Sequence, residues 1–371
     1  MTARKPRQSG IELVKILAIF LVVLSHVTQT LFTPQGLWGY AGGAFWDLDA
    51  PAADWQHFAL LLCMDAGVIG NGIFFLASAW FLCGSSQVKP EKFLRMELNV
   101  WSVSVLVLLG FLAAGLRPGL TTIIPCCFPT LFSTNWYITC YLMLYLVHPY
   151  CNRLIYNLSK RDLLGLTAGL VFCYVFLGTL SPGMLFSSQL IVFLTLYFMV
   201  ACLRQYPPRW LESARVNLLI LAAGCTGVFL LLYGTNWLNT RSPGSISPMR
   251  WYTTQNFFNL MIAFSLFQLF RRLHFTSRWV NRLSGLSLLI YLLHDNILFK
   301  VYLRPLPLLW IFQKYGYGAV FGWVLLYALV LFAGCALLAG LYQAVTGKLF
   351  GRVSRLLAQK LFPDRQATCQ H

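Results

Sequence analysis

Residues 11–32 read IELVKILAIFLVVLSHVTQTLF, an apolar run in which Glu12, Lys15 and His26 are the only ionisable side chains. Crossing the hydrocarbon core of a bilayer takes about 20 apolar residues in a helix. Similar runs recur along the whole chain, at about 66–83, 94–116, 136–156, 163–180, 185–203, 216–233, 257–270, 283–302 and 320–345. The sequence therefore predicts an all-α integral membrane protein with about ten transmembrane helices.

The composition agrees with this class. Of 371 residues, 58% are hydrophobic and 11% are charged, whereas soluble domains have about 25% charged residues. The aromatic share of 16% excludes a disordered chain, because disordered chains are poor in aromatic residues. The eleven cysteines are scattered and lack the spacing of a metal site. We therefore expect buried thiols, no disulfide framework, and neither a bound metal nor a bound cofactor.

The net charge of +17 is distributed over alternate loops. With the N-terminus in the cytoplasm, the inner segments carry 21 of the 28 Lys and Arg residues, and the outer segments carry five. This is the positive-inside pattern, and it predicts that both termini are cytoplasmic. A nucleic-acid-binding protein would gather its basic residues in one patch or stripe. The expected partner of these charges is therefore the lipid bilayer and not nucleic acid.

Two predicted outer segments have a different composition. Residues 33–65 carry four Asp and three Trp residues but no Lys or Arg. Acidic and aromatic groups suit a carbohydrate-like ligand, and they equally suit an interfacial aromatic belt; both interpretations stay open. Residues 234–253 are rich in Gly, Pro, Ser and Trp and are predicted to form a lid or cap loop.

Ionisable side chains at membrane depth are costly to bury and are therefore candidates for function. Lys15 and His26 are eleven residues apart, so on one helix they share a stripe and lie about 16 Å apart. Glu12 lies one turn from Lys15 and is placed to pair with it. The pattern suits a catalytic His26 above a cytosol-facing cation. Alternatively, Lys15 extends to the inner interface and His26 hydrogen-bonds a neighbouring helix.

His294 and Asp295 end the ninth apolar run, near the outer surface. A His beside an Asp suits acid–base chemistry. Adjacent helical side chains point about 100° apart, so interfacial packing is the alternative. The chain has no GxSxG nucleophile elbow, phosphate-binding glycine loop or metal-ligand spacing. The sequence therefore does not favour serine-triad, cysteine-nucleophile or metal chemistry.

Four segments, read in order, resemble acyltransferase family 3, a family of membrane O-acyltransferases. The first, GIELVKILAIFLVVLSH at 10–26, keeps the family's basic residue eleven positions before its catalytic His, with Lys15 where Arg is usual. The second is GIFFLASAWFL at 72–82, followed by the basic segment 89–95. The others are NWY at 135–137 with HPYCN at 148–152, and SLLIYLLH at 287–294. Lys is a point charge, so the bidentate contact that Arg offers is not expected at Lys15.

The resemblance implies transfer of an acyl group, most often acetyl from acetyl-CoA, to a hydroxyl of a cell-surface or lipid-linked glycan. It implies a multi-pass protein of a bacterial plasma membrane, with a transmembrane acyltransferase domain at 1–350 and a cytoplasmic C-terminal tail at 351–371. His26 is then the catalytic residue, as general base or as acyl-carrying nucleophile. The candidate acyl-CoA contacts are Lys15, Glu12, Lys92, Arg95 and Arg153, and the candidate supporting residues are Asn71, Ser78, Asn135 and His294.

A membrane transporter of a small polar solute or glycan intermediate is the alternative function. Transporters often have internal repeats and Gly or Pro in the middle of their helices. Here Gly and Pro concentrate at the ends of the apolar runs, and the two halves of the chain show no symmetry. This pattern favours the enzyme, and the sequence gives no indication of the oligomeric state.

Overall fold

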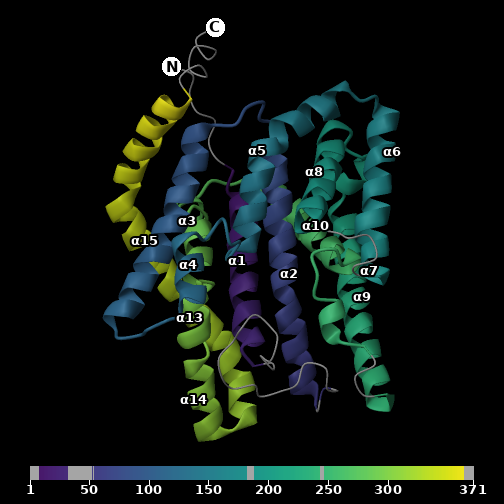
Figure 1. The fold of residues 1–371 in the computed structure, drawn as a ribbon. Helices are drawn as coiled ribbons and strands as arrows, with labels where there is room; N and C mark the ends of the chain where they lie inside the picture. The colour runs from purple at the N-terminus through teal and green to yellow at the C-terminus, as the bar shows by residue number, and fades with distance from the viewer. Residues whose placement is uncertain (1–7, 32–51, 53, 182–187, 243–245, 363–371) are drawn as a thin grey trace.

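The computed structural model describes residues 8–31, 52, 54–181, 188–242 and 246–362, and the regular structure within these ranges is entirely helical (Figure 1). In chain order the helices are α1 (Ser9–Gln29), α2 (Trp55–Leu82), α3 (Pro90–Ala113), α4 (Leu120–Cys127), α5 (Trp136–Asn157), α6 (Lys160–Val171), η1 (Phe172–Leu177), α7 (Gly178–Leu180), α8 (Gln189–Gln205), η2 (Arg209–Glu212), α9 (Ala214–Arg241), η3 (Pro248–Arg250), α10 (Phe257–Arg271), α11 (Arg278–Ser284), α12 (Ser287–His294), α13 (Ile297–Tyr302), α14 (Leu306–Tyr315) and α15 (Tyr317–Leu361).

Six helical segments in the described ranges are long and apolar enough to cross a membrane. They are α1, α2, α3, α9, α15 and the continuous segment from α6 to α7. Helices α8 and α10 are apolar but shorter. The predicted all-helical class is confirmed for the described residues. The number of ten spans and the side of the membrane on which the termini lie stay predictions.

Helices α1 and α2 form the centre of the protein, and α15 lies at its edge. In the apolar windows of α1 and α2, 61% and 67% of the residues are buried, against 22% in α15. Large apolar side chains on the outer faces are exposed, among them Leu337, Leu341 and Val345 of α15. Such faces are stable against lipid, which is as apolar as the side chains themselves.

Helices α1 and α2 pack closely because α2 carries glycines where the two helices touch. A Cβ atom on Gly70 would lie 2.5 Å from the Ala18 carbonyl oxygen, and one on Gly67 would lie 2.6 Å from Ser25 Cβ. Small residues permit this approach between membrane helices. Because Ser25 faces α2, the next residue, His26, projects about 100° away around α1 and is available to another helix.

The described parts of the segments predicted to be cytoplasmic gather at one end of the bundle (Figure 1). This end also holds the start of α1 and the start of α3, and we call it the basic end. The Ser9 amide donates a hydrogen bond of 2.9 Å to the Phe275 carbonyl oxygen. Arg271 and Arg272 contact Glu212 at 3.2 and 3.6 Å. The end of α15, yellow in Figure 1, lies toward the same end.

Helix α2 begins earlier than its hydropathy predicts. Asp54 caps it, because its side chain accepts a hydrogen bond from the His57 amide, and Asp is among the preferred N-cap residues. Residues 55–65 therefore belong to a helix and not to an outer loop, and Asp65 is buried with 4% exposure. The rest of the predicted loop that is not described comprises residues 33–51 and 53.

The structure adds detail to three other predicted segments. The predicted lid at 234–253 is partly helical, because α9 continues to Arg241. The ninth apolar run is broken into α12 and α13, and Asn296 caps α13 by accepting hydrogen bonds from the Leu298 and Phe299 amides. Helix α15 has 45 residues, so residues 351–361 of the predicted C-terminal tail continue a helix; 363–371 lie outside the described residues.

Candidate functional site

The site begins at the basic end with the side chain of Lys15 on α1. Lys15 Nζ lies 3.1 Å from Glu12 Oε2, one turn earlier on the same helix. The Ser284 hydroxyl, at the end of α11, donates to the same carboxylate oxygen. Glu12 is 1% exposed, whereas the Lys15 side chain keeps 21% exposure. The predicted Glu12–Lys15 pair is therefore present, and it holds the ammonium group at the edge of the bundle interior.

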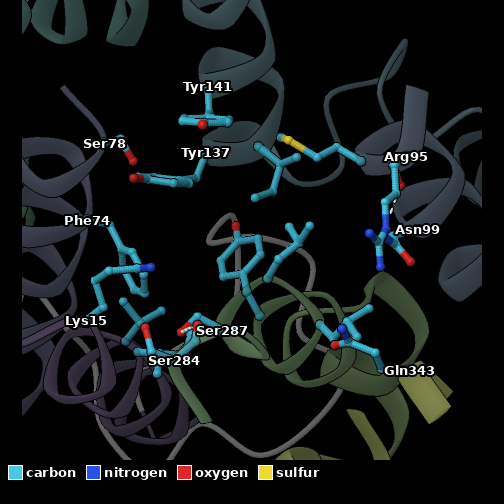
Figure 2. Close-up of a pocket in the computed structure, with 18 of the residues that line it drawn as sticks. Lys15, Phe74, Ser78, Arg95, Asn99, Tyr137, Tyr141, Ser284, Ser287 and Gln343 are labelled. Atoms are coloured by element: carbon cyan, nitrogen blue, oxygen red, sulfur yellow. Dashed lines mark hydrogen bonds between the residues drawn. The ribbon is translucent and has the colours of Figure 1, made fainter. Parts of the chain in front are cut away.

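A cavity of about 560 Å³ opens beside Lys15 (Figure 2). Helices α1, α2, α3, α5, α12 and α15 contribute to its wall. Five of the predicted site residues line it: Lys15, Asn71, Ser78, Lys92 and Arg95. Residues from distant parts of the sequence thus meet around one space inside the protein.

Helix α3 supplies two of the three cations of this cavity. Lys92 and Arg95 are three residues apart, so they lie on the same face in the first turns of the helix. Lys92 Nζ lies 3.5 Å from the Tyr141 hydroxyl and 4.9 Å from the centre of the Tyr145 ring. Figure 2 shows Arg95 beside Asn99, across the cavity from Lys15. Cations on opposite walls of one cavity can contact a single anionic ligand between them.

The cavity follows one stripe of α1 toward the other end of the bundle. Lys15, Ile19 and Val22 line it at the spacing of one helical face. His26 is the next residue on this stripe, but it does not line the cavity. The cavity therefore ends about one helical turn short of His26.

His26 meets α12 at the end of this stripe. Its Nδ1 atom lies 3.0 Å from His294 Nε2 and 3.4 Å from Asp295 Oδ1. The two imidazole rings are 5.1 Å apart. His294 is fully buried, and the His26 side chain keeps 13% exposure. Among the described residues, the polar groups that contact the His26 ring thus come from α12 and the residue that follows it.

Hydrogen bonding assigns the proton on each ring when both are neutral. His294 Nδ1 lies 2.7 Å from the Ile290 carbonyl oxygen, and a carbonyl only accepts hydrogen bonds. His294 Nδ1 therefore carries the proton, and Nε2 is an acceptor. His26 Nδ1 must then donate to His294 Nε2, which leaves His26 Nε2 with the available lone pair.

Arg304 completes this cluster, and the sequence did not indicate its role. Its guanidinium is fully buried and lies 3.6 Å from Asp295 Oδ1 and 3.4 Å from the His294 carbonyl oxygen. The Tyr327 hydroxyl of α15 donates to the Arg304 carbonyl oxygen at 2.9 Å. A buried carboxylate requires such a counter-charge. We call His26, His294, Asp295 and Arg304 the histidine cluster.

Aromatic rings separate the cavity from the histidine cluster. Tyr291 lines the cavity, and its ring centre lies 5.8 Å from that of His294 and 6.3 Å from that of Tyr137. Phe75 and Phe193 pack against Tyr137 at 5.8 and 5.5 Å. A ligand that enters at the basic end therefore meets aromatic side chains before it reaches His26.

Two further predicted site residues are not among the side chains that line the cavity. Arg153 is exposed on α5, with its guanidinium 5.9 Å from the centre of the Tyr150 ring. Asn135 is buried at the start of α5 but does not line the cavity. Within the described ranges, no three His, Cys, Asp or Glu side chains are grouped so as to hold a metal ion.

Comparison with known proteins identifies the family. The profile described as an acyltransferase domain, that of acyltransferase family 3, matches residues 8–340. No curated protein and no solved structure matches the chain. The matched region contains the whole histidine cluster and the cavity wall apart from Gln343, Thr346 and Gly347 of α15. This helical membrane protein, with its cation-lined cavity below a buried histidine pair, therefore belongs to acyltransferase family 3.

Proposed function

We propose that the protein is a membrane O-acyltransferase that moves an acyl group, most readily acetyl, from acyl-CoA to a hydroxyl of a cell-surface or lipid-linked glycan. The observation that carries this proposal is the cavity, which begins at three cations and ends one turn below His26. Acyl-CoA has the matching order of groups, with phosphates at one end and the reactive thioester at the end of a long arm.

The proposed orientation follows from the charges. The basic end faces the cytoplasm of a bacterial cell, as the positive-inside rule predicts. Lys15, Lys92 and Arg95 attract the phosphates of CoA there. The pantetheine arm extends along the α1 stripe toward His26. The acceptor hydroxyl approaches the histidine cluster from the opposite, external side.

The chemical step uses the nitrogen that hydrogen bonding leaves available. His26 Nε2 takes the proton from the acceptor hydroxyl while that oxygen attacks the thioester carbonyl carbon. The C–S bond then breaks, the acyl group stays on the acceptor oxygen as an ester, and the CoA thiolate takes the proton from His26. His294 accepts the hydrogen bond from His26 Nδ1, and Asp295 stabilises the imidazolium that forms between the two transfers.

The alternative chemical step uses the same nitrogen as a nucleophile. His26 Nε2 would attack the thioester, release CoA and carry the acyl group as an acyl-imidazole to the acceptor. Without acceptor, radiolabelled acetyl-CoA would then leave label on the parent protein and none on His26→Ala. Label on neither protein indicates general-base catalysis.

The test of the function is transfer of label from radiolabelled acetyl-CoA to a surface-glycan extract by purified protein in lipid nanodiscs. His26→Ala should lower the rate at least about 100-fold. His274→Ala is the matched control, because His274 is exposed and lies outside the cluster and the cavity; its rate should equal that of the parent. Equal transfer by the parent and His26→Ala would contradict the proposal.

A further inference from the structure

The Tyr137 hydroxyl is a buried polar group that lies beside Ser78 without meeting the geometry of a hydrogen bond. Tyr137 is in the first turn of α5 and is 8% exposed. Among the described residues, no hydrogen-bond partner is found for its oxygen. Buried polar groups in native proteins nearly always have a partner, and each exception calls for an explanation.

The ring of Tyr137 is fixed by its neighbours, so the hydroxyl has a defined direction. Its ring centre lies 5.8 Å from that of Phe75, 5.5 Å from that of Phe193 and 5.8 Å from that of Trp136. The residue lines the cavity, and Figure 2 shows its oxygen directed along the wall toward Ser78. The hydroxyl therefore lies in the cavity wall beside Ser78, within reach of a ligand that fills the cavity.

Other polar side chains line the cavity at membrane depth. Asn71 and Ser78 are seven residues apart on α2, which places them on one face about 10 Å apart. Ser284 and Ser287 line the wall of α11 and α12. The two serine hydroxyls already donate within the protein, Ser284 to Glu12 and Ser287 to the Ser284 carbonyl oxygen. A donor with a hydrocarbon chain in this space would set an apolar group against the Tyr137 hydroxyl and the Asn71 side chain, at a cost in free energy. A donor whose arm carries amide groups would pair with them.

We infer that Tyr137 recognises the linker of the donor, by donating a hydrogen bond to an amide oxygen of the pantetheine arm between the phosphates and the thioester. This inference rests on the proposed function and narrows its donor class. The cavity binds a thioester carried on an amide-containing arm. The hydrocarbon chain of an acyl phospholipid has no amide group to hydrogen-bond the polar side chains of the cavity. Tyr137 is in this view a substrate-binding residue.

Equilibrium binding of two ligands to protein in nanodiscs tests this inference. CoA carries the arm, whereas 3′-phospho-ADP carries the same nucleotide without it. Tyr137→Phe removes one oxygen and keeps the ring. It should raise the Kd for CoA about threefold to tenfold, the usual range for one hydrogen bond, and leave the Kd for 3′-phospho-ADP unchanged.

Tyr233→Phe is the matched control. Its ring stacks on Phe229 of α9, away from the cavity, and is half exposed. It should bind both ligands as the parent does. The melting temperatures of both variants report whether the loss of a hydroxyl has altered the fold.

Four other results of the binding measurements would contradict the inference, and one of them would also contradict the proposed function. If Tyr137→Phe binds CoA as tightly as the parent, the inference fails while the proposed function stands. Equal weakening for both ligands also overturns it, since the effect would then be structural. If the parent binds CoA no more tightly than 3′-phospho-ADP, the arm makes no net contact and the inference fails. If the parent binds neither ligand, the proposed function fails with it.

Discussion

His26 Nδ1 lies 3.0 Å from His294 Nε2, although the two residues are 268 positions apart in the sequence. The contact forms because α12 ends at His294, beside the face of α1 that does not pack against α2. It directs one nitrogen of His26 into the cluster and leaves the other for a substrate. Most of the predictions below depend on this pair or on the cavity beneath it.

Replacing His294 should lower the rate of acyl transfer without weakening the binding of CoA. His294→Ala removes the acceptor for His26 Nδ1, and a hydrogen bond to a group that becomes charged contributes about 1.5–3 kcal/mol. We expect kcat to fall about 10- to 100-fold. His294→Gln, whose amide oxygen can accept the same hydrogen bond, should retain more activity. Equal losses in the two variants would contradict the positioning role.

Replacing Lys15 should weaken the binding of CoA more than it changes the chemical step. Lys15→Met keeps much of the side-chain length and removes the charge, so the Kd for CoA should rise about tenfold. Lys15→Arg should restore binding, because a guanidinium offers a bidentate contact to phosphate. Lys314, which lies 4.9 Å from the Trp310 ring outside the cavity, provides the control Lys314→Met. An unchanged Kd in Lys15→Met would refute the contact.

Breaking the ion pair in the histidine cluster should destabilise the protein. Arg304 is fully buried against Asp295, and removing one partner of such a pair costs about 3–5 kcal/mol. Arg304→Met should therefore lower the melting temperature in detergent by several degrees, as measured by tryptophan fluorescence. The double variant with Asp295→Asn should recover part of this loss, because it buries no uncompensated charge. A double variant less stable than Arg304→Met would exclude this explanation.

Cysteine labelling should place the two ends of the bundle on opposite sides of the membrane. In a background without native cysteines, Arg278→Cys at the basic end should react only after the membrane is opened. Lys314→Cys, and Asp49→Cys in a segment outside the described residues, should react with an impermeant reagent in intact cells. Labelling of Arg278→Cys in intact cells would reverse the proposed orientation. The basic end would then face the outside of the cell, away from cytosolic acyl-CoA.

The sequence predicted the structure correctly where a local pattern of residues is compatible with only one kind of local structure. An apolar run of about 20 residues forms a helix in a bilayer because its backbone groups must be satisfied internally. Helical periodicity likewise placed Glu12 beside Lys15. Five of the side chains predicted for the site also line one cavity. Their roles in binding and catalysis stay predictions until they are tested.

The sequence was uninformative where the site depends on how broken helices pack. The ninth apolar run has no Pro or Gly between Ser287 and Tyr302 to mark its interruption after His294. Arg304 returns toward His294 because its amide bonds the Phe299 carbonyl oxygen at 2.9 Å after α13 ends. Such a turn leaves no periodic signal. The polar Tyr137 hydroxyl was also missed, since a Tyr in an apolar run resembles any other core aromatic residue.

The early end of α12 has an electrostatic consequence for His26. Aligned peptide dipoles leave partial negative charge at the carboxyl end of a helix, and this charge favours a nearby cation. Helix α12 stops at His294, whose side chain contacts the His26 ring, so the carboxyl end of the helix is the part nearest the ring that would gain a positive charge during proton transfer. In an uninterrupted ninth helix, the carboxyl end and its partial negative charge would lie farther along the chain, away from the His26 imidazole. The interruption thus supplies His26 with a fixed negative potential that needs no additional acidic side chain in the membrane.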